Sequence, residues 1–197
     1  IVGFLRSLAF NINMIRPTRI IVVFDGKGGS NRRRKIFPQY KAGRKMSYRL
    51  NRANDYLTRD EEQRMMIRQL NRVVEYLECL PISIMNMENI EADDVIGYLS
   101  KHIYKNNKTT IVSTDKDFLQ LVDKTTNVYS PTKKIMYDED KVFNEYGIHP
   151  SNFLLFRMFD GDKSDGIPGV NGIGKKTLIK LFPFIGTEDK YTLDDIY

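Results

Sequence analysis

Eight acidic side chains form four short clusters, each at a position where a strand should end or a helix should begin. They are Asp25, then Glu91, Asp93 and Asp94, then Asp115 and Asp117, and finally Asp162 and Asp165. Carboxylates gathered in one place repel each other unless cations neutralise them. Ligands that are all oxygen favour Mg²⁺ or Mn²⁺ over zinc. The clusters therefore predict a metal-dependent enzyme.

Two of these clusters also have a simpler interpretation as helix caps. The second cluster stands where a helix should start, and the helix dipole favours negative charge there. Asp115 and Asp117 are likewise suited to capping a helix that begins near Phe118. Either cluster alone is weak support for a metal site, so the hypothesis depends on all four clusters together.

A strongly basic segment separates the first two acidic clusters. Residues 27–49 contain no acid and nine cations, which are Lys27, Arg32, Arg33, Arg34, Lys35, Lys41, Arg44, Lys45 and Arg49. A solvated charged loop is the simpler interpretation. Like charges repel, however, and nucleic-acid phosphates would relieve that repulsion. The net charge of +6 also favours a polyanionic partner.

The predicted elements alternate between strands and helices. Buried strands are expected at residues 19–24, 82–85 and 109–113, and a small hairpin at 128–137. Helices are expected at residues 3–15, 58–80, 91–104, 138–146, 150–159 and 175–181. This order indicates an α/β fold with a mostly parallel central sheet flanked by helices. Ligands bind at the carboxyl ends of such strands, which would bring the acidic clusters to one edge.

The segment GDKSDGIPGVNGIGKKT places two acids ahead of glycine-rich turns and a helix. Backbone amides at such turns bind phosphate, and we expect Gly172, Gly174, Lys175 and Lys176 to do so. The pattern is typical of a helix–hairpin–helix, which follows one DNA strand without reading its bases. The segment also fits the nucleotide-binding pattern GxxxxGK, but Lys176 stands where that loop requires Ser or Thr.

Composition excludes several classes of protein. No apolar run reaches the length of a membrane span, and no secretion signal is recognisable. The single cysteine, Cys79, excludes an internal disulfide and fits a reducing, cytoplasmic compartment. The 197 residues suffice for one domain, with or without a small appendage. Because the chain begins with Ile1, we expect it to be a piece of a longer protein.

The chain resembles the 5′ nucleases, which include flap endonucleases, bacteriophage 5′→3′ exonucleases with RNase H-type activity and the 5′-nuclease domain of bacterial DNA polymerase I. The motifs are VVFDG, YKAGRK, EADDVIG, STDKDFLQL and GDKSDGIPGVNGIGKKT, in the family's order between residues 22 and 182. The phage and bacterial branch is the more similar, which implies a bacterial or phage-infected cell. The resemblance implies a PIN-like fold with a helix–hairpin–helix and a basic helical arch at about residues 27–58.

The resemblance also implies a role for each matching residue. Asp25, Glu91 and Asp93, with Asp94 beside them, match the first metal site; Asp115 and Asp117 match ligands between the two sites; Asp162 and Asp165 match the second site. The implied catalytic residues are Lys41 and Arg44, which would contact the scissile phosphate, with Asp25 and Asp117. The expected DNA-binding residues are Arg32, Arg33, Arg34, Lys35, Tyr40, Lys41, Arg44, Gly172, Gly174, Lys175 and Lys176. Two Mg²⁺ or Mn²⁺ ions, and K⁺ at the helix–hairpin–helix, are the implied cofactors.

One departure from the family concerns the start of the chain. The family begins with a strand whose Asp supplies another ligand of the first site, and the sequence IVGFLRSL resembles the helix after that strand. We therefore expect that strand and its carboxylate to be missing, which would leave an unpaired sheet edge. The expected division is an α/β catalytic core at residues 1–149 and a truncated helix–hairpin–helix region at 150–197.

Three functional hypotheses follow from these observations. The first is a structure-specific 5′ nuclease acting by two-metal-ion catalysis on 5′ ends or flaps of DNA and on RNA–DNA primers. The second is a non-catalytic DNA-binding fragment that is inactive because the first-strand carboxylate is absent. The third is another metal–carboxylate phosphotransfer enzyme, such as a phosphatase, which the helix–hairpin–helix pattern disfavours. The expected partners are 5′-flap DNA and RNA–DNA hybrids, with replication proteins as further partners of a monomer.

Overall fold

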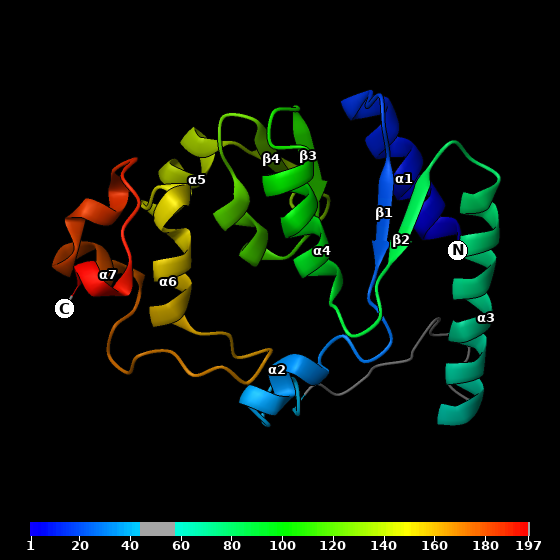
Figure 1. The fold of residues 1–197 in the computed structure, drawn as a ribbon, viewed down its shortest axis with the longest axis horizontal. Helices are drawn as coiled ribbons and strands as arrows, with labels where there is room; N and C mark the ends of the chain where they lie inside the picture. Colours follow the sequence, from blue (N-terminus) through cyan, green and yellow to red (C-terminus); the bar gives the residue numbers. More distant parts are fainter. Residues whose placement is uncertain (44–57, 197) are drawn as a thin grey trace. The chain divides into compact units, whose positions relative to one another are not determined.

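Figure 1 shows the protein as a computed structural model, which describes residues 1–43 and 58–196. The chain divides into two compact units. The first unit comprises Ile1–Phe24 and Arg44–Asn86, and the second comprises Asp25–Gly43 and Met87–Tyr197. Arg44 and the part of the predicted arch that follows it, up to residue 57, lie outside the described residues.

The first unit contains a pair of parallel strands, β1 (Ile21–Phe24) and β2 (Ser83–Asn86), in which Ile21 lies opposite Ser83. Parallel neighbours need a long crossover, and the connection between these strands includes the helix α3 (Arg59–Glu78). The helix α1 (Val2–Ile15) precedes β1, and the amino group of Ile1 donates to the side chain of Gln69 on α3. These elements are drawn from blue to cyan-green in Figure 1.

The start of α3 is determined by its own sequence. The Thr58 hydroxyl accepts a hydrogen bond from the Glu61 amide, and the Glu61 carboxylate accepts one from the Thr58 amide at 2.9 Å. Such a reciprocal cap satisfies two amides that have no partner within the helix. This arrangement confirms the prediction that Thr58 caps the helix.

The second unit contains a three-stranded sheet in the order β3 (Thr109–Val112), β4 (Thr126–Ser130) and β5 (Ile135–Tyr137). β3 and β4 are parallel, and β4 and β5 form an antiparallel pair. The α/β class and the parallel pairing are thus confirmed. In the described parts of the chain the strands form two small sheets, because no strand there bonds to members of both.

Five α-helices accompany this sheet in the second unit: α2 (Asn31–Ile36), α4 (Ala92–Tyr98), α5 (Glu139–Tyr146), α6 (Phe153–Asp160) and α7 (Lys175–Leu181). α4 continues into a π-helical turn at Leu99–Ile103, and 3₁₀ turns occur at Lys116–Leu121, Pro150–Asn152, Pro183–Gly186 and Leu193–Asp195. The aliphatic and aromatic core includes Ile111, Val128, Val142, Phe153 and Leu178. The apolar run at residues 153–159 thus contributes to the core, as its composition predicts.

The length and polarity of the helices determine whether they could cross a membrane. Over residues 1–43 and 58–196, every helix is too short or too polar to traverse a bilayer. The predicted boundary between a catalytic core at residues 1–149 and a helix–hairpin–helix region at 150–197 falls inside the second unit. This division by function stays a prediction.

One buried polar side chain holds the carboxyl-terminal part of the second unit. Asn152 is fully buried, and its amide nitrogen donates to the carbonyl oxygens of Ile185, Thr187 and Asp189 at 2.8–3.2 Å. Its amide oxygen accepts from the Tyr191 backbone at 2.9 Å. Every polar atom of the side chain is therefore used to fix one irregular segment.

Replacing Asn152 with Leu should destabilise this segment. The substitution leaves buried backbone groups without partners, and each such group costs about 1–3 kcal/mol. We expect the free energy of unfolding, measured by chemical denaturation, to fall by about 3 kcal/mol. Asn106→Ala, at an exposed turn, is the control and should change it by less than about 0.5 kcal/mol. Equal effects of the two substitutions would contradict the assignment.

Candidate metal and nucleic-acid site

Glu91 lies at the centre of a buried polar cluster in the second unit. It stands at the amino end of α4 and is only 4% exposed. Its carboxylate accepts hydrogen bonds from the guanidinium of Arg33, the ammonium of Lys41 and the hydroxyl of Tyr40. Glu91 occupies the N-cap position of α4, although its side chain makes no cap hydrogen bond. A buried carboxylate needs such charged partners.

Asp25 caps α4 instead, from a distant part of the sequence. Its Oδ1 atom accepts from the Ala92 amide at 2.8 Å. The loop after Asp25 packs tightly against the loop before α4, and the Gly26 amide donates to the Ile90 carbonyl at 3.1 Å. A side chain at Gly26 would overlap the carbonyl oxygen of Met87. The glycine thus allows the first and second acidic clusters to approach each other.

Asp93 and Asp94 occupy the first turn of α4, where the helix dipole favours acids. Asp94 makes a two-pronged ion pair with Arg33, at 2.7 and 2.8 Å. The pKa of Asp93 is raised, first by loss of hydration and then by the negative charges of Asp115, Asp25 and Glu91, against the opposing effect of Lys41. The first three acidic clusters therefore lie close enough to act on each other.

Asp115 and Asp117 lie on the turn that follows β3. Asp115 caps the 3₁₀ turn by accepting from the Asp117 amide at 2.9 Å, which confirms its alternative role as a cap. The pKa of Asp117 is raised, mainly by burial and further by the charges of Asp115 and Asp162, although Arg157 lowers it. Asp117 is thus the electrostatic link between the third and fourth clusters.

Asp162 organises the loop that carries the fourth cluster. Its Oδ1 atom accepts from the amide and the hydroxyl of Ser164, both at 2.7 Å, and from the Asp165 amide at 3.2 Å. Its backbone forms a bridge with Ile167 that closes the loop. Burial opposes ionisation of Asp162, but these hydrogen bonds hold the pKa of Asp162 below its ordinary value. Asp165 is buried in the same loop.

Arg157 contacts both of the last two clusters, and its role was not predicted from the sequence. From α6, its Nε atom donates to Asp117 at 2.6 Å and its Nη2 atom donates to Asp162 at 2.8 Å. Burial lowers the pKa of Arg157, but the bond to Asp117 and the surrounding acids raise it above its ordinary value. In the sequence, Arg157 stands out as a lone arginine within the apolar run FLLFRMF, shortly before Asp162 and Asp165.

The segment that contains Tyr40 and Lys41 connects the second and fourth clusters. The Lys41 amide donates to the Asp165 carbonyl at 2.8 Å, and Lys41 adopts a positive φ of 57°. The Tyr40 ring is buried and lies beneath the Lys41 ammonium, 4.9 Å from the ring centre. Burial raises the pKa of Tyr40 to about 12, so its hydroxyl remains a donor to Glu91.

The arrangement of the acids is therefore close but not convergent. Over residues 1–43 and 58–196, no three acids form a group that could hold a single metal ion. Oxygens of Glu91, Asp94, Asp117 and Asp162 are directed to Arg33, Lys41 and Arg157 instead. The oxygen-only donor set and the mutual repulsion around Asp93 still fit a hard divalent cation. The ligand assignments stay predictions.

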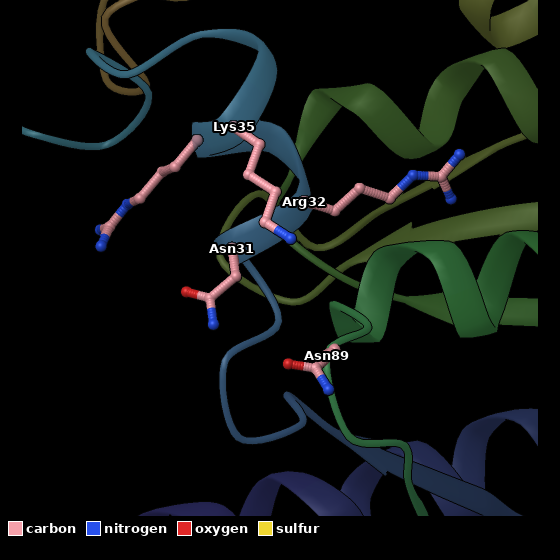
Figure 2. A pocket seen from close by; sticks show the side chains of 5 residues that line it. Asn31, Arg32, Lys35 and Asn89 are labelled. Carbon is pink, nitrogen blue, oxygen red and sulfur yellow. The ribbon is translucent and has the colours of Figure 1, made fainter.

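A basic pocket lies beside this cluster. It has a volume of about 520 Å³ and is lined by Asn31, Arg32, Arg34, Lys35 and Asn89. Figure 2 shows that the labelled cations come from α2 and that Asn89 comes from the loop before α4. Arg34 donates to the Tyr40 carbonyl at 3.3 Å, which ties the pocket to the Glu91 cluster. Asn31 and Asn89 were not identified from the sequence.

The glycine-rich loop before α7 presents accessible backbone. Gly172 has a positive φ of 79°, and there is open space where side chains would stand at Gly172 and Gly174. Lys176 is exposed, whereas the Lys175 ammonium turns back to the Glu145 carbonyl at 3.1 Å and the Tyr146 ring. The loop follows α6 and its bridge rather than a strand, as expected if it is not a nucleotide-binding loop. The helix–hairpin–helix assignment stays a prediction.

Comparison with known families shows to which family the chain belongs. The family profile described as "5′-3′ exonuclease, N-terminal resolvase-like domain" matches residues 1–147. The chain belongs to the 5′ nuclease family. This confirms the resemblance inferred from the motifs.

Two relatives of this 5′ nuclease chain illustrate the range of proteins that contain the domain. A 5′-3′ exonuclease of Aquifex aeolicus is 34% identical over 188 residues, covering 95% of this chain and 60% of the relative. A DNA polymerase I of Lactococcus lactis is 34% identical over 194 residues, covering 95% of this chain and 20% of the relative. The chain thus spans from a fifth to three fifths of these relatives.

Solved structures confirm the fold of the 5′ nuclease chain. The T5 D15 protein, co-crystallised with metal ions, has a TM-score of 0.79 and 23% identity, covering 99% of this chain and 70% of that chain. The same T5 protein, described as a flap endonuclease, in a complex with DNA and metal ions has a TM-score of 0.73 and 23% identity over 95% of this chain and 67% of that chain.

Replacing Gly26 with Ala should separate the loops that bring Asp25 to α4. The added methyl group overlaps the Met87 backbone, which cannot move away as a flexible side chain would. We expect the free energy of unfolding to fall by about 2–3 kcal/mol, measured by thermal denaturation.

Gly43→Ala is the matched control for this experiment. Gly43 belongs to the same unit, and nothing lies within 4 Å of the position where its side chain would stand. It should leave the stability within about 0.5 kcal/mol of the original. A Gly26→Ala protein that is as stable as this control would show that the loop contact is not required.

Proposed function

We propose that the chain is the catalytic part of a structure-specific 5′ nuclease that hydrolyses phosphodiesters at 5′ ends or flaps of DNA and RNA–DNA primers. The observation that carries the proposal is the electrostatic coupling of acids from four separate segments. Asp93 responds to Asp25, Glu91 and Asp115, and Asp117 responds to Asp115 and Asp162. Family membership and the basic pocket beside these acids support it.

In this proposal, two Mg²⁺ or Mn²⁺ ions are held by the acids. Structures of the T5 protein with metal ions, divalent zinc among them, support divalent metal use. Asp25, Glu91, Asp93 and Asp94 form the first site, Asp162 and Asp165 the second, and Asp115 and Asp117 stand between them. When bound, the ions would lower the pKa of an attacking water and neutralise charge on the phosphate. K⁺ at the glycine-rich loop is part of the same proposal.

The protein's own cations would bind and orient the nucleic acid. Lys41 is the best placed of them, because its ammonium already lies at Glu91 and its backbone is bonded to Asp165. There it would add positive charge beside the scissile phosphate, with Arg44 as the second such group. Arg32, Arg34 and Lys35 would bind further phosphates in the basic pocket.

A non-catalytic DNA-binding role is the second candidate. The ion pairs of Arg33 and Arg157 favour it, because they already neutralise carboxylates that a metal site requires. The two candidates differ in one measurement, which is Mg²⁺-dependent cleavage of a 5′-labelled flap by the longer protein that contains this chain. Binding without cleavage would favour the second candidate.

The proposed nuclease is also expected to be cytoplasmic and monomeric, with replication proteins as partners.

Asp117→Ala and Asp162→Ala should each abolish flap cleavage while leaving flap affinity within a small factor. Both acids are proposed metal ligands, and neither is placed against the nucleic acid. Cleavage rates and electrophoretic binding assays measure the two effects separately. We expect cleavage to fall at least about a hundredfold.

Asp140→Ala is the control for this pair of variants, because Asp140 is an exposed acid in the first turn of α5. It should cleave at the normal rate. Normal cleavage by Asp162→Ala would show that the second metal site is assigned wrongly, whereas loss of cleavage in Asp140→Ala would show that the assay reports on folding.

The basic pocket gives a prediction about salt. The double substitution Arg32→Ala/Lys35→Ala should weaken binding to all flap sequences alike. If each cation contacts one phosphate, the slope of log affinity against log salt should become shallower by about 2. Lys105→Ala/Lys124→Ala, which removes two exposed cations elsewhere in the same unit, should leave the slope unchanged. Equal slopes for the two double variants would exclude the pocket as a phosphate site.

A further inference from the structure

Arg157 is a charged side chain in an otherwise apolar stretch of α6, and it is turned toward the acids. Only 14% of its side chain is exposed. Its guanidinium donates to Asp117 at 2.6 Å, to Asp162 at 2.8 Å and to Asp160 at 3.3 Å. A planar fork of donors with a permanent charge is well suited to holding several carboxylates at once.

The oxygen atoms that Arg157 contacts are the ones a cation would need. Asp162 has two carboxylate oxygens, and Oδ1 already accepts hydrogen bonds from Ser164 and Asp165. The other oxygen, Oδ2, accepts from Arg157. A divalent ion at Asp162 must therefore share Oδ2 with the guanidinium or displace it. Arg157 also contacts Oδ1 of Asp117, so an ion that uses this oxygen must likewise share or displace the guanidinium.

We propose that Arg157 is a positioning residue that acts as an internal counter-ion for the acids. In the cation-free protein its guanidinium holds Asp117 and Asp162 together and neutralises their repulsion. A divalent ion that binds these carboxylates competes with it, so Arg157 sets the metal concentration at which the site fills. This inference rests on the proposed function, because it takes Asp117 and Asp162 to be metal ligands.

Two opposite effects of removing Arg157 follow from this competition. Without metal, the acids lose their counter-ion, so the protein should be less stable. With metal, the competing positive charge is gone, so affinity should rise rather than fall. A purely structural role predicts the reverse for metal, because a loosened site would bind the ion less tightly. The direction of the change in affinity therefore separates the two roles.

The test is calorimetric titration of the 197-residue protein with Mn²⁺ at about pH 8, where free carboxylates are ionised. Arg157→Met keeps an apolar stem but removes the charge, and it should bind Mn²⁺ more tightly by on the order of tenfold. Arg157→Lys keeps the charge but not the fork, and it should fall between Met and the original. Without metal, the midpoint of thermal unfolding should be lowest in Arg157→Met, intermediate in Arg157→Lys and highest in the original protein. Added Mn²⁺ should raise this midpoint most in Arg157→Met.

Lys101→Met is the matched control. Lys101 pairs with Asp123 at 2.5 Å in the same unit and contacts none of the proposed ligands. Its loss should lower the midpoint of unfolding without changing the affinity for Mn²⁺. This control shows whether removal of any buried or half-buried cation is enough to raise metal affinity through net charge alone.

The outcomes distinguish this inference from the proposed function. Equal or weaker Mn²⁺ binding by a folded Arg157→Met protein would overturn the inference while leaving the nuclease intact. If Arg157→Met does not fold, Arg157→Lys decides, and an affinity no higher than the original would overturn the inference. Absence of Mn²⁺ binding to the original protein would overturn the proposed function and the inference together.

Discussion

Repulsion between carboxylates is the constraint on which the second unit depends. Acids from four segments lie close enough to alter one another's ionisation, and burial of Glu91 adds to the cost. The chain offsets this cost with three of its own cations, Arg33, Lys41 and Arg157. The acids are thus held together, with positive charge already among them. Under the proposed function, that arrangement is suited to exchange of a protein cation for a metal ion.

The helix caps and the strands could be predicted from the sequence. Asp138 caps α5 by accepting from the Lys141 amide, and the Thr58 cap of α3 also forms as its pattern predicts. The β-branched runs become strands within a residue or two of the expected bounds, and the turns after them carry the acids. These features depend on neighbours along the chain, which is why a single sequence is enough to predict them.

Partner choice across the fold could not be predicted in this way. Asp25 caps a helix 67 residues away, and Arg33 pairs with Glu91 and Asp94. The role of Arg157, which lies in an apolar run, could not be predicted because it depends on which acids the fold brings to it. The separation of the strands into two sheets likewise depends on long-range pairing. Spacing along the chain carries no information about such contacts, whereas motif order does indicate the family.

Paramagnetic broadening by Mn²⁺ tests the central claim most directly, because a bound paramagnetic ion broadens the backbone amide signals that lie near it. In a ¹⁵N spectrum of the protein, the account predicts that the signals of Asp25, Asp93, Asp117 and Asp162 lose intensity together at the lowest Mn²⁺ concentrations. The amide of Asp123, an acid paired outside the cluster, should broaden only later. Independent or uniform broadening of these signals would contradict the claim that the acids lie together around the proposed metal ions.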